Sequence, residues 1–563
     1  MSLLDFPDEL LLKVASLLPQ KSLLNLSFTC RSIHTIVTPD LYLNVLINSS
    51  KRVFDEEFDI KTKSFGCDLR PPVVIRSLFA LSRFFKNLAL NSRYASALRR
   101  LEVQGSFPDV PQHDLDCSLQ AVFPLLVNLV VLRWYCENSP LDASLLNLLP
   151  SAESLQVLGG NFMFNSFSSV PSESRIRILD VSNFGTSDVV AGIHLAHCPR
   201  LTSLKIARLP SKPNNALSEK SSSPNVVNLS DSYSGGNKGL SYVSALFLPK
   251  PSFALQLEEL TLADISISAM DAELLSNSIN LTLLKSFAIY NCVEMVDLEH
   301  QTSHRVIRRT LPTNTFFKKI VSYLANLKLL VYDVKNNYCE DSSIFGSIAQ
   351  IHALEELSMR MHLYRQNGKV DLTPFINKLQ KHSASLERLE LFCDFSEMPN
   401  GPLCSVFSQP VHIRSLVSLS NFTKLRILAI PIVQEQLLVL FESLPCESAT
   451  ILRLAVTDQQ SFSSFSSCNS CTNGAMYEVY NSVCLVSQEF FSCPSTFGSK
   501  IVETGEQIYM DHANRYKEVA KRLEYVRFDF KSQSLLFDCR FPNKVITKDA
   551  IYLDHYDNLT HKY

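Results

Sequence analysis

The sequence has neither an excess of basic charge nor the glycine that phosphate-binding loops need. Its 53 Lys and Arg residues against 55 Asp and Glu residues give a formal net charge of −2. No basic stripe appears along the chain, so we do not expect nucleic acid as a partner. Only 15 of the 563 residues are glycine, which leaves little material for loops that cradle phosphate groups.

Long apolar runs are also missing. None reaches the roughly 20 residues that cross a bilayer, and the best candidate, residues 121–132, ends at Arg133. The chain opens on an amphipathic segment without a signal peptide. Its 15 cysteines are therefore expected to be free thiols in a reducing compartment. We expect no membrane partner and a cytoplasmic and/or nuclear location.

Motifs of known catalytic sites are absent too. The sequence contains no P-loop, no G-x-S-x-G, no H-E-x-x-H and no dinucleotide-binding fingerprint. His194, His197 and Cys198 are metal ligands by residue type, but the repeat pattern described below accounts for Cys198 and places His194 on a helix. We therefore expect no catalytic residue, no metal site and no cofactor.

One group of cysteines leaves an alternative open. The Ser-rich stretch that begins at residue 461 contains a C-x-x-C pair with two further cysteines downstream, and four thiolates could hold zinc. Against zinc, the spacing is unequal, and incidental cysteines are common in Ser-rich loops. An enzyme built on this loop has no other support, and zinc content would test it. The four residues are Cys468, Cys471, Cys484 and Cys493.

A dense apolar pattern fills the first 47 residues. Pro7-Asp8-Glu9 predicts a helix start, because Pro is tolerated in the first turn and acidic side chains favour the positive end of the helix dipole. Apolar residues then recur at three- and four-residue steps until Pro19 ends the helix, and a second apolar run extends to a break at Thr38-Pro39. A segment this small is marginal alone and usually needs a partner. A helical cap on the following domain is the alternative.

These residues resemble an F-box. The signature (Leu/Phe)-Pro-x-Glu-Leu-Leu-x-x-(Ile/Val) lies on residues 6–14 and its second half on residues 23–31, although Ile33 and His34 stand where the family often has an aromatic residue. The resemblance implies docking on a Skp-family adaptor, which joins F-boxes to a cullin–RING ubiquitin ligase. The adaptor-binding residues implied in this way are Pro7, Glu9, Leu10, Leu11, Val14, Leu18, Leu23, Leu24, Leu26 and Cys30.

A junction and then a short repeat follow the F-box. Within the junction, residues 73–90 have apolar residues at helical spacing and predict one buried helix that fixes the F-box to the next domain. From Leu98 onward the pattern apolar-x-x-apolar-x-apolar returns thirteen times, with common gaps of roughly 21 to 32 residues. Each copy predicts one strand whose alternate apolar residues enter the core, and the rest of the repeat returns the chain through a helix. The copies are Leu98/Leu101/Val103, Leu129/Leu132/Trp134, Leu155/Leu158, Ile176/Leu179/Val181, Leu201/Leu204/Ile206, Leu257/Leu260/Leu262, Leu284/Phe287/Ile289, Leu327/Leu330/Tyr332, Leu354/Leu357/Met359, Leu386/Leu389/Leu391, Leu425/Leu428/Ile430, Leu452/Leu454 and Leu523/Val526/Phe528.

The clearest unit, Ser182–Leu204, resembles the cysteine-containing class of leucine-rich repeats, which is often joined to F-boxes. The predicted fold is therefore an α/β leucine-rich-repeat solenoid, a horseshoe with parallel strands on its concave face and helices outside, preceded by a small all-α F-box. The predicted domains are an F-box at 1–47, a helical junction at 48–97, repeats at 98–456 with a disordered insertion at 210–238, a Ser/Cys-rich insertion at 457–516, and a last repeat with a C-terminal cap at 517–563.

Strand positions between the core residues face the concave surface in such a fold. They combine charges with aromatic side chains, which suits protein recognition, although a solvated strand face is the plainer interpretation for any one of them. The tail, residues 551–563, is an alternative occupant of this face. The positions are Arg100, Glu102, Arg133, Tyr135, Asp180, Lys205, Thr261, Tyr290, Asp333, Ser358, Arg360, Glu390, Phe392, Tyr525 and Arg527, of which Tyr135, Tyr290, Arg360, Phe392 and Arg527 are the candidate target-binding residues.

The resemblance and the repeats together predict a non-catalytic subunit of an SCF-type ubiquitin ligase. Its F-box would dock the Skp adaptor of the cullin–RING core, and its repeats would bind a protein target for ubiquitination and degradation. The alternative is an F-box scaffold with leucine-rich repeats that acts without ubiquitin transfer.

Overall fold

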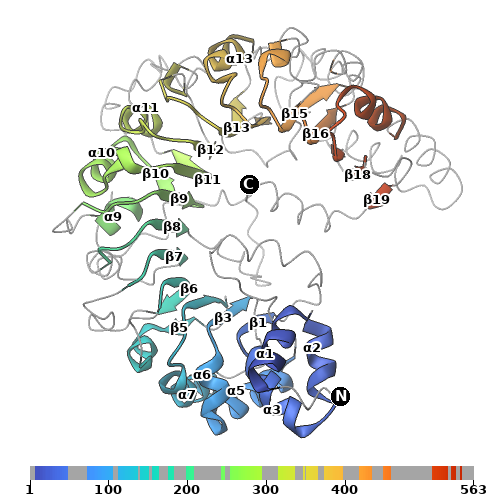
Figure 1. Ribbon diagram of the computed structural model, residues 1–563. Coiled ribbons are helices and arrows are strands. Elements are labelled where there is room, and N and C mark those ends of the chain that lie inside the picture. Colours follow the sequence, from blue (N-terminus) through green and yellow to red (C-terminus); the bar gives the residue numbers. More distant parts are fainter. Residues whose placement is uncertain are drawn as a thin grey trace, which may run out of the picture. The chain divides into compact units, whose positions relative to one another are not determined.

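A computed structural model gives the fold of the chain (Figure 1). It describes residues 7–18, 20–48, 73–75, 77–104, 112–136, 140–150, 155–163, 175–182, 198–207, 242–247, 254–294, 315–335, 346–348, 350–364, 373–396, 418–433, 440, 448–457, 510–529, 534–539 and 545–547. The chain divides into two compact units, unit 1 (Met1–Leu284) and unit 2 (Lys285–Tyr563). The predicted insertion at 210–238, the four cysteines of the zinc alternative, His194, His197 and the tail 551–563 lie outside the described residues.

Unit 1 opens with three helices, α1 (Asp8–Leu17), α2 (Gln20–Ser27) and α3 (Arg31–Leu41). The helix start after Pro7 is confirmed. The predicted break at Thr38-Pro39 is wrong, because α3 continues through Pro39 to Leu41. Only two helical residues follow Pro39, so few hydrogen bonds depend on its missing N–H. The hydroxyl of Thr38 donates to the carbonyl of His34 at 2.6 Å within the same turn.

The parallel sheet of unit 1 begins sooner than the repeat pattern predicts. Strand β1 (Asn44–Asn48) follows α3 after only two residues and pairs in parallel with both β2 (Val73–Ile75) and β3 (Arg100–Gln104). Its centre, Val45-Leu46-Ile47, is β-prone and almost fully buried. The predicted F-box boundary at residue 47 therefore falls inside strand β1. The sheet begins before residue 98, where the predicted repeats start.

The predicted helix at 73–90 is only partly present. Residues 73–75 form β2, and helix α5 (Leu78–Leu90) begins after Ser77, whose hydroxyl accepts the N–H of Ala80 at 3.2 Å. Two β-branched valines and an isoleucine favour the strand, because they pack well on a pleated surface. The helix is also amphipathic, since Leu88 is fully buried while Leu90 is 77% exposed.

Aromatic stacking joins the three-helix segment to the sheet. Tyr42, directly after α3, stacks on Phe84 of α5 at 5.9 Å between ring centroids and on Tyr94 of α6 (Ser92–Ala97) at 5.0 Å. Helices α3 and α6 are also in contact. The predicted fixing of the first helices onto the next domain therefore has a physical basis in this stack.

The strands of unit 1 lie in the order β2-β1-β3-β4-β6-β7-β8-β9, and all of these pairings are parallel. Where the structure describes the connections, short helices return the chain between strands on one side of the sheet (Figure 1). The remaining strands are β4 (Val131–Tyr135), β5 (Leu141–Asp142), β6 (Val157–Met163), β7 (Ile178–Ser182), β8 (Ser203–Ala207), β9 (Glu259–Ala263) and β10 (Ser266–Ile267). The returning helices are α7 (Gln112–Val122), η3 (Phe123–Leu125), η4 (Ala143–Leu148), α9 (Tyr242–Phe247), α10 (Ala269–Ser278) and η6 (Leu281–Leu283).

Within its described residues, unit 2 repeats this arrangement with seven parallel strands, β11 to β17. Two antiparallel strands, β18 (Ser534–Asp538) and β19 (Val545–Thr547), follow β17. The parallel strands are β11 (Ser286–Glu294), β12 (Leu329–Lys335), β13 (Glu356–Tyr364), β14 (Arg388–Ser396), β15 (Ile427–Val433), β16 (Ile451–Thr457) and β17 (Tyr525–Asp529). The helices are α11 (Phe316–Ile320), η8 (Val321–Tyr323), α13 (Thr373–Leu379), η9 (Gln380–His382), η10 (Ser418–Asn421) and a helix at 510–519.

The helix at 510–519 lies partly inside the predicted insertion at 457–516. Ala513 and Tyr516 are buried in it, at 2% and 1% exposure, and β17 follows after a short turn. The helix therefore belongs to the last strand's repeat, and the predicted insertion at 457–516 ends before residue 510.

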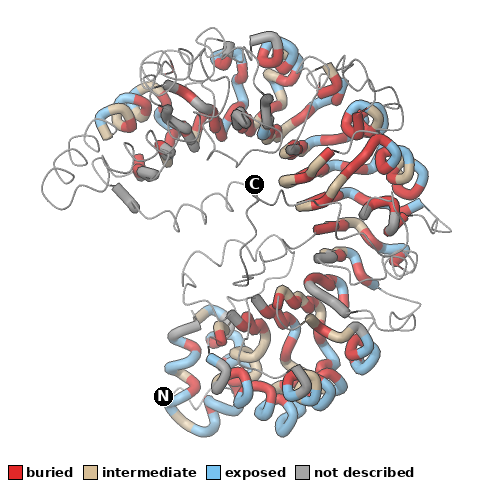
Figure 2. Tube along the Cα trace, turned by 180° about the vertical axis from the view of Figure 1, so that it is seen from behind, coloured by how far each residue is buried: buried red, intermediate tan, exposed pale blue. Residues whose placement is uncertain are grey.

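All thirteen copies of the sequence pattern coincide with a parallel strand, β3, β4, β6 to β9 and β11 to β17. The two strand residues of a copy point into the core, as at Leu101 and Val103 or at Leu389 and Leu391, which are all 0% exposed. Buried positions therefore recur from strand to strand in each unit (Figure 2). The fold is mixed α/β with extensive parallel sheet, and in neither unit do the end strands of the described sheet pair with each other.

Candidate functional site

Helix α1 has two apolar faces, and only one of them is buried by the protein itself. Leu11 and Ala15, four residues apart, are 6% and 0% exposed. Leu10, Val14 and Leu17 follow the same helical spacing on another face and are 47%, 46% and 81% exposed. Placing apolar side chains in water at this spacing is typical of a helix that meets a partner.

Helix α2 and the turn after it repeat this division. Leu23 is 1% exposed and packs with Leu11 and with Ile33 of α3 in the core of the three helices. Leu24 and Phe28, again four residues apart, are 44% and 73% exposed. Two rows of exposed apolar residues therefore exist on the first helices, one on α1 and one along and just beyond α2.

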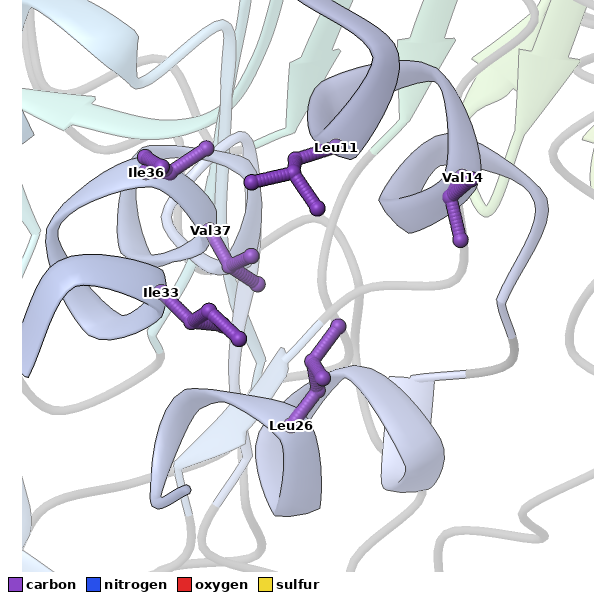
Figure 3. A pocket seen from close by; sticks show the side chains of 6 residues that line it. All are labelled: Leu11, Val14, Leu26, Ile33, Ile36 and Val37. Atoms are coloured by element: carbon purple, nitrogen blue, oxygen red, sulfur yellow. The ribbon is translucent and has the colours of Figure 1, made fainter. Parts of the chain in front are cut away.

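A small apolar pocket lies among the three helices (Figure 3). Leu11 and Val14 line it from α1, and Leu26 lines it from α2. The wall from α3 consists of Ile33, Ile36 and Val37. Val14 is thus both a pocket residue and a half-exposed one, so the pocket borders the exposed row of α1.

The ten residues predicted to bind an adaptor therefore fall into different environments. Leu11 and Leu23 hold the helices together, which gives them a structural role in this conformation. Cys30 is the N-cap of α3, since its sulfur accepts the N–H of Ile33 at 3.5 Å. The exposed members are Pro7, Glu9, Leu10, Val14 and Leu24, and the partly buried ones are Leu18, Leu26 and Cys30.

Leu17 and Phe28 lie outside the predicted adaptor-binding set. Both are more exposed than any apolar residue within it. Their spacing places them on the exposed rows, because Leu17 is seven residues after Leu10 and Phe28 is four residues after Leu24.

The sheet face of unit 1 carries a cluster of three charges. Arg100 Nη2 lies 2.6 Å from Glu102 Oε2, with both residues at the same face of β3. Arg133 of β4 is in register with Glu102, and its Nη1 lies 3.9 Å from the same carboxylate oxygen. The side chains of Arg100 and Glu102 are only 7% and 5% exposed. One carboxylate is thus shared by two guanidinium groups.

Tyr135, a predicted target-binding residue, is engaged within the protein. Its hydroxyl donates to Asp180 of β7, which also lies 3.3 Å from Lys205 Nζ of β8. Burial, and then the charge of Asp180, raise the pKa of Tyr135. Gly159 of β6 lies between β4 and β7, and a Cβ atom there would be 3.1 Å from the Tyr135 hydroxyl. The missing side chain lets Tyr135 reach across β6.

The sheet face of unit 2 carries a cluster of one guanidinium and two carboxylates, the reverse of the cluster in unit 1. Arg388 Nη2 lies 2.8 Å from Glu390 Oε1, and Arg388 Nη1 lies 3.7 Å from Glu356 Oε2 of β13. The side chains of Arg388 and Glu390 are 4% and 3% exposed, whereas that of Glu356 is 18% exposed. Burial raises the pKa of Glu356 to about 7, although Arg388 acts in the opposite direction.

The other four predicted target-binding residues lie on the sheet of unit 2. Tyr290 of β11 is half-buried, and its pKa is raised by burial while Arg388 lowers it. Arg360 of β13 is exposed and in register with Asp333 of β12 and with Phe392 of β14. Arg527 lies farther along the sheet, on β17. The structure therefore gathers Tyr290, Arg360 and Phe392 on β11 to β14, with Arg527 apart from them.

Two more buried ionisable groups of unit 2 have structural partners. Glu294, at the end of β11, accepts the N–H of Phe316 at 2.6 Å, and burial raises its pKa to about 7. His382 Nδ1 accepts the N–H of Leu354 at 3.3 Å, and burial lowers its pKa to about 4. Within the described residues, no group of three or more His, Cys, Asp or Glu side chains is arranged to hold a metal ion. No described helix has the length and apolar character of a membrane span.

Comparison with known proteins places the first helices in a family. The model of the F-box domain matches residues 3–42, which span α1, α2 and α3 and end just before β1. The chain therefore carries an F-box domain, as the sequence signature predicts. F-box domains typically bind Skp-type adaptors, and proteins that carry them are generally non-catalytic substrate receptors. A search of curated proteins gives no match.

Proposed function

We propose that this protein is the substrate-recognition subunit of an SCF-type ubiquitin ligase. The F-box would dock a Skp-family adaptor and so recruit the cullin–RING core. The parallel sheets, interpreted as leucine-rich repeats, would bind the protein that is to be ubiquitinated and degraded. Catalysis would then come from proximity, because the receptor holds the target beside the ubiquitin-charged enzyme. A cytoplasmic and/or nuclear location belongs to the same proposal.

The observation that carries the proposal is the exposed apolar face of the F-box. Leu10, Val14 and Leu17 on α1 are exposed to water, although the side chains on the neighbouring face of the same helix are buried. Fully burying one Leu or Val side chain is worth about 1.5–3 kcal/mol, so these three side chains together would contribute substantially to binding. The stack of Tyr42 on Phe84 and Tyr94 supports the rest of the proposal, because it would hold a docked adaptor in a fixed orientation to the adjoining sheet.

The leucine-rich-repeat interpretation has its own support. Thirteen copies of one spacing coincide with thirteen parallel strands, and core residues such as Leu101, Leu204 and Leu389 are buried. Stacked repeats of this kind build a continuous sheet face from many short units. Such a face suits the recognition of another protein.

The test of adaptor docking is the variant Leu10→Glu, studied by co-precipitation with a purified Skp-family adaptor. An unpaired carboxylate at an apolar interface costs more than the lost burial, so we expect binding to fall by roughly 30-fold or more. The matched control is Leu283→Glu, because Leu283 is 41% exposed against 47% for Leu10 and lies outside the F-box. Undiminished binding by Leu10→Glu, or equal loss in both variants, would contradict the proposal.

The second candidate is an F-box scaffold that binds the adaptor without ubiquitin transfer. The exposed F-box face fits both candidates equally. Reconstitution with the cullin–RING core separates them: the receptor should co-purify with cullin and promote ubiquitination of proteins bound to its sheet, whereas a scaffold should bind the adaptor alone.

A further inference from the structure

In the described cluster on β13 and β14, one buried cation, Arg388, lies against two carboxylates. Arg388 pairs with Glu390 at 2.8 Å and with Glu356 at 3.7 Å. The shorter contact lies wholly among buried side chains, so most of the attraction of the guanidinium is directed to Glu390. When Glu356 is ionised, its charge is therefore compensated by Arg388 less than the charge of Glu390 is.

Glu356 is also the member of this cluster that solvent reaches. Its side chain is 18% exposed, against 3–4% for Arg388 and Glu390. Ser358 lies two residues further along the same strand, and Tyr290 is close enough to interact electrostatically with Glu356; both are half-buried. A charged group that arrives at this face therefore meets Glu356 in a partly dehydrated environment, where ion pairing is stronger than in open water.

We propose that this face docks a segment of the target protein that places a Lys or Arg side chain beside Glu356. The inference rests on the proposed role as a target receptor and specifies the chemistry of the target. The arriving cation would compensate the charge that Arg388 does not, which is the complementarity that sets specificity between partners. Tyr290 beside the site supplies the aromatic contact common at such anchors.

The ionisation of Glu356 gives the proposal a pH signature. Burial holds the pKa of this carboxyl at about 7 in the protein without target. The charged groups that shift the pKa of Glu356 are Arg388, Glu390 and Glu387. Tyr290 is close enough to interact with Glu356, and Asp333 in turn interacts with Tyr290. Only the ionised carboxylate attracts a cation, so the affinity for a basic segment should rise roughly tenfold from pH 6 to pH 8.

The test uses the full chain as bait for a display library of short random peptides. Wild-type protein should enrich peptides with Lys or Arg at one fixed position. The variant Glu356→Gln should lose this enrichment, because Gln resembles the neutral carboxyl that burial already favours and so preserves the fold. The matched control is Glu355→Gln, which removes the same charge from the adjacent exposed residue that pairs with Lys328 at 2.7 Å. A selected peptide, resynthesised, should bind Glu356→Gln at least about tenfold more weakly and Glu355→Gln unchanged.

The outcomes separate this inference from the proposed function. Adaptor binding is measured on the same variants and should be unchanged, so a chain that fails to bind the adaptor contradicts the proposed function alone. Absence of enriched peptides, enrichment of acidic ones, or equal enrichment by wild type and Glu356→Gln would overturn the inference. Basic peptides selected only by a chain that lacks residues 551–563 would assign the face to the chain's own tail and overturn it too.

Discussion

The same three residues occur at the same repeat position in both units, yet they form clusters of opposite charge. Arg100-Leu101-Glu102 lies on β3 and Arg388-Leu389-Glu390 lies on β14. In both, the leucine is fully buried and the arginine pairs with the glutamate two residues later, at 2.6 and 2.8 Å. The pair is thus a property of the strand itself.

The neighbouring strand makes the difference. In unit 1, Arg133 of β4 is in register with Glu102 and adds a second cation. In unit 2, Glu356 of β13 is in register with Arg388 and adds a second carboxylate. A strand's own sequence therefore fixes the ion pair, and its neighbour fixes the excess charge that the face presents to a partner.

The largest expected loss of stability follows from removing Arg388, the cation that two carboxylates of unit 2 share. Arg388→Met removes the guanidinium that lies 2.8 Å from buried Glu390, and breaking a buried pair in this way costs about 3–5 kcal/mol. Hydrogen exchange of β13 and β14 should report this loss of stability. The companion variant, Arg388→Met with Glu390→Met, should recover most of it, because both buried charges of the pair are then gone. A loss below about 1 kcal/mol for the single variant would show that the pair does not stabilise the sheet.

The corresponding change in unit 1 should be smaller. Glu102→Gln keeps a hydrogen-bond acceptor for Arg100 but leaves two guanidinium groups without their carboxylate, so we expect a loss of about 2 kcal/mol. Trp134 is the single tryptophan of the chain and is 1% exposed in unit 1, so its fluorescence during urea unfolding follows this unit. Unchanged stability would contradict the role of Glu102 as the shared ion.

A pH dependence should distinguish unit 2 further. Burial raises the pKa of Glu294 to about 7, so its stabilising contribution is complete below about pH 4.5 and is lost as the pH rises through 7. Glu356 acts in the same direction, whereas His382, with a pKa lowered to about 4, loses its contribution as the pH falls from 6.5 through 4. Glu294→Gln should therefore flatten the decline in stability of unit 2 between pH 4.5 and 7, by up to about 3 kcal/mol. Hydrogen exchange at several pH values measures the stability of unit 2. An unaltered dependence of this stability on pH would contradict the raised pKa of Glu294.

The smallest effect should come from an exposed pair. Lys328 and Glu355 are 2.7 Å apart, but their side chains are 56% and 42% exposed. Glu355→Gln should change the stability of unit 2 by less than about 0.5 kcal/mol in the same hydrogen-exchange measurement. A loss as large as that of Arg388→Met would show that burial does not decide the value of these pairs.

The strands could be predicted from the sequence because one local pattern determines them. Apolar residues at alternate positions mark these strands, except that Gly160 follows Leu158 in β6, and the burial of such residues follows directly from that alternation. The prediction was wrong where two patterns overlap. Val73-Val74-Ile75 fits a helical spacing as well as a strand, and only pairing with β1 decides between them.

Arg100, Glu102, Arg133 and Glu390 are among the predicted face positions, but which charges meet across strands could not be predicted, because it depends on register between strands that are distant in the sequence. Arg388 and Glu356 are not among the predicted face positions. Tyr135 was included as an exposed anchor, yet its hydroxyl bonds to Asp180 across the gap left by Gly159. On α1, the sequence identified the apolar residues, but only the packing of α3 distinguishes buried Leu11 from exposed Leu10.

The central claim is that the F-box of this chain binds a Skp-family adaptor through its exposed apolar face. Isothermal titration of the purified chain with the purified adaptor tests it most directly, with Leu17→Glu and Leu90→Glu as paired variants. These leucines are 81% and 77% exposed, and only Leu17 lies in the F-box. The account predicts a one-to-one complex that Leu17→Glu weakens by at least about tenfold and Leu90→Glu leaves intact. Absence of binding by the unmodified chain, or equal weakening in both variants, would contradict it.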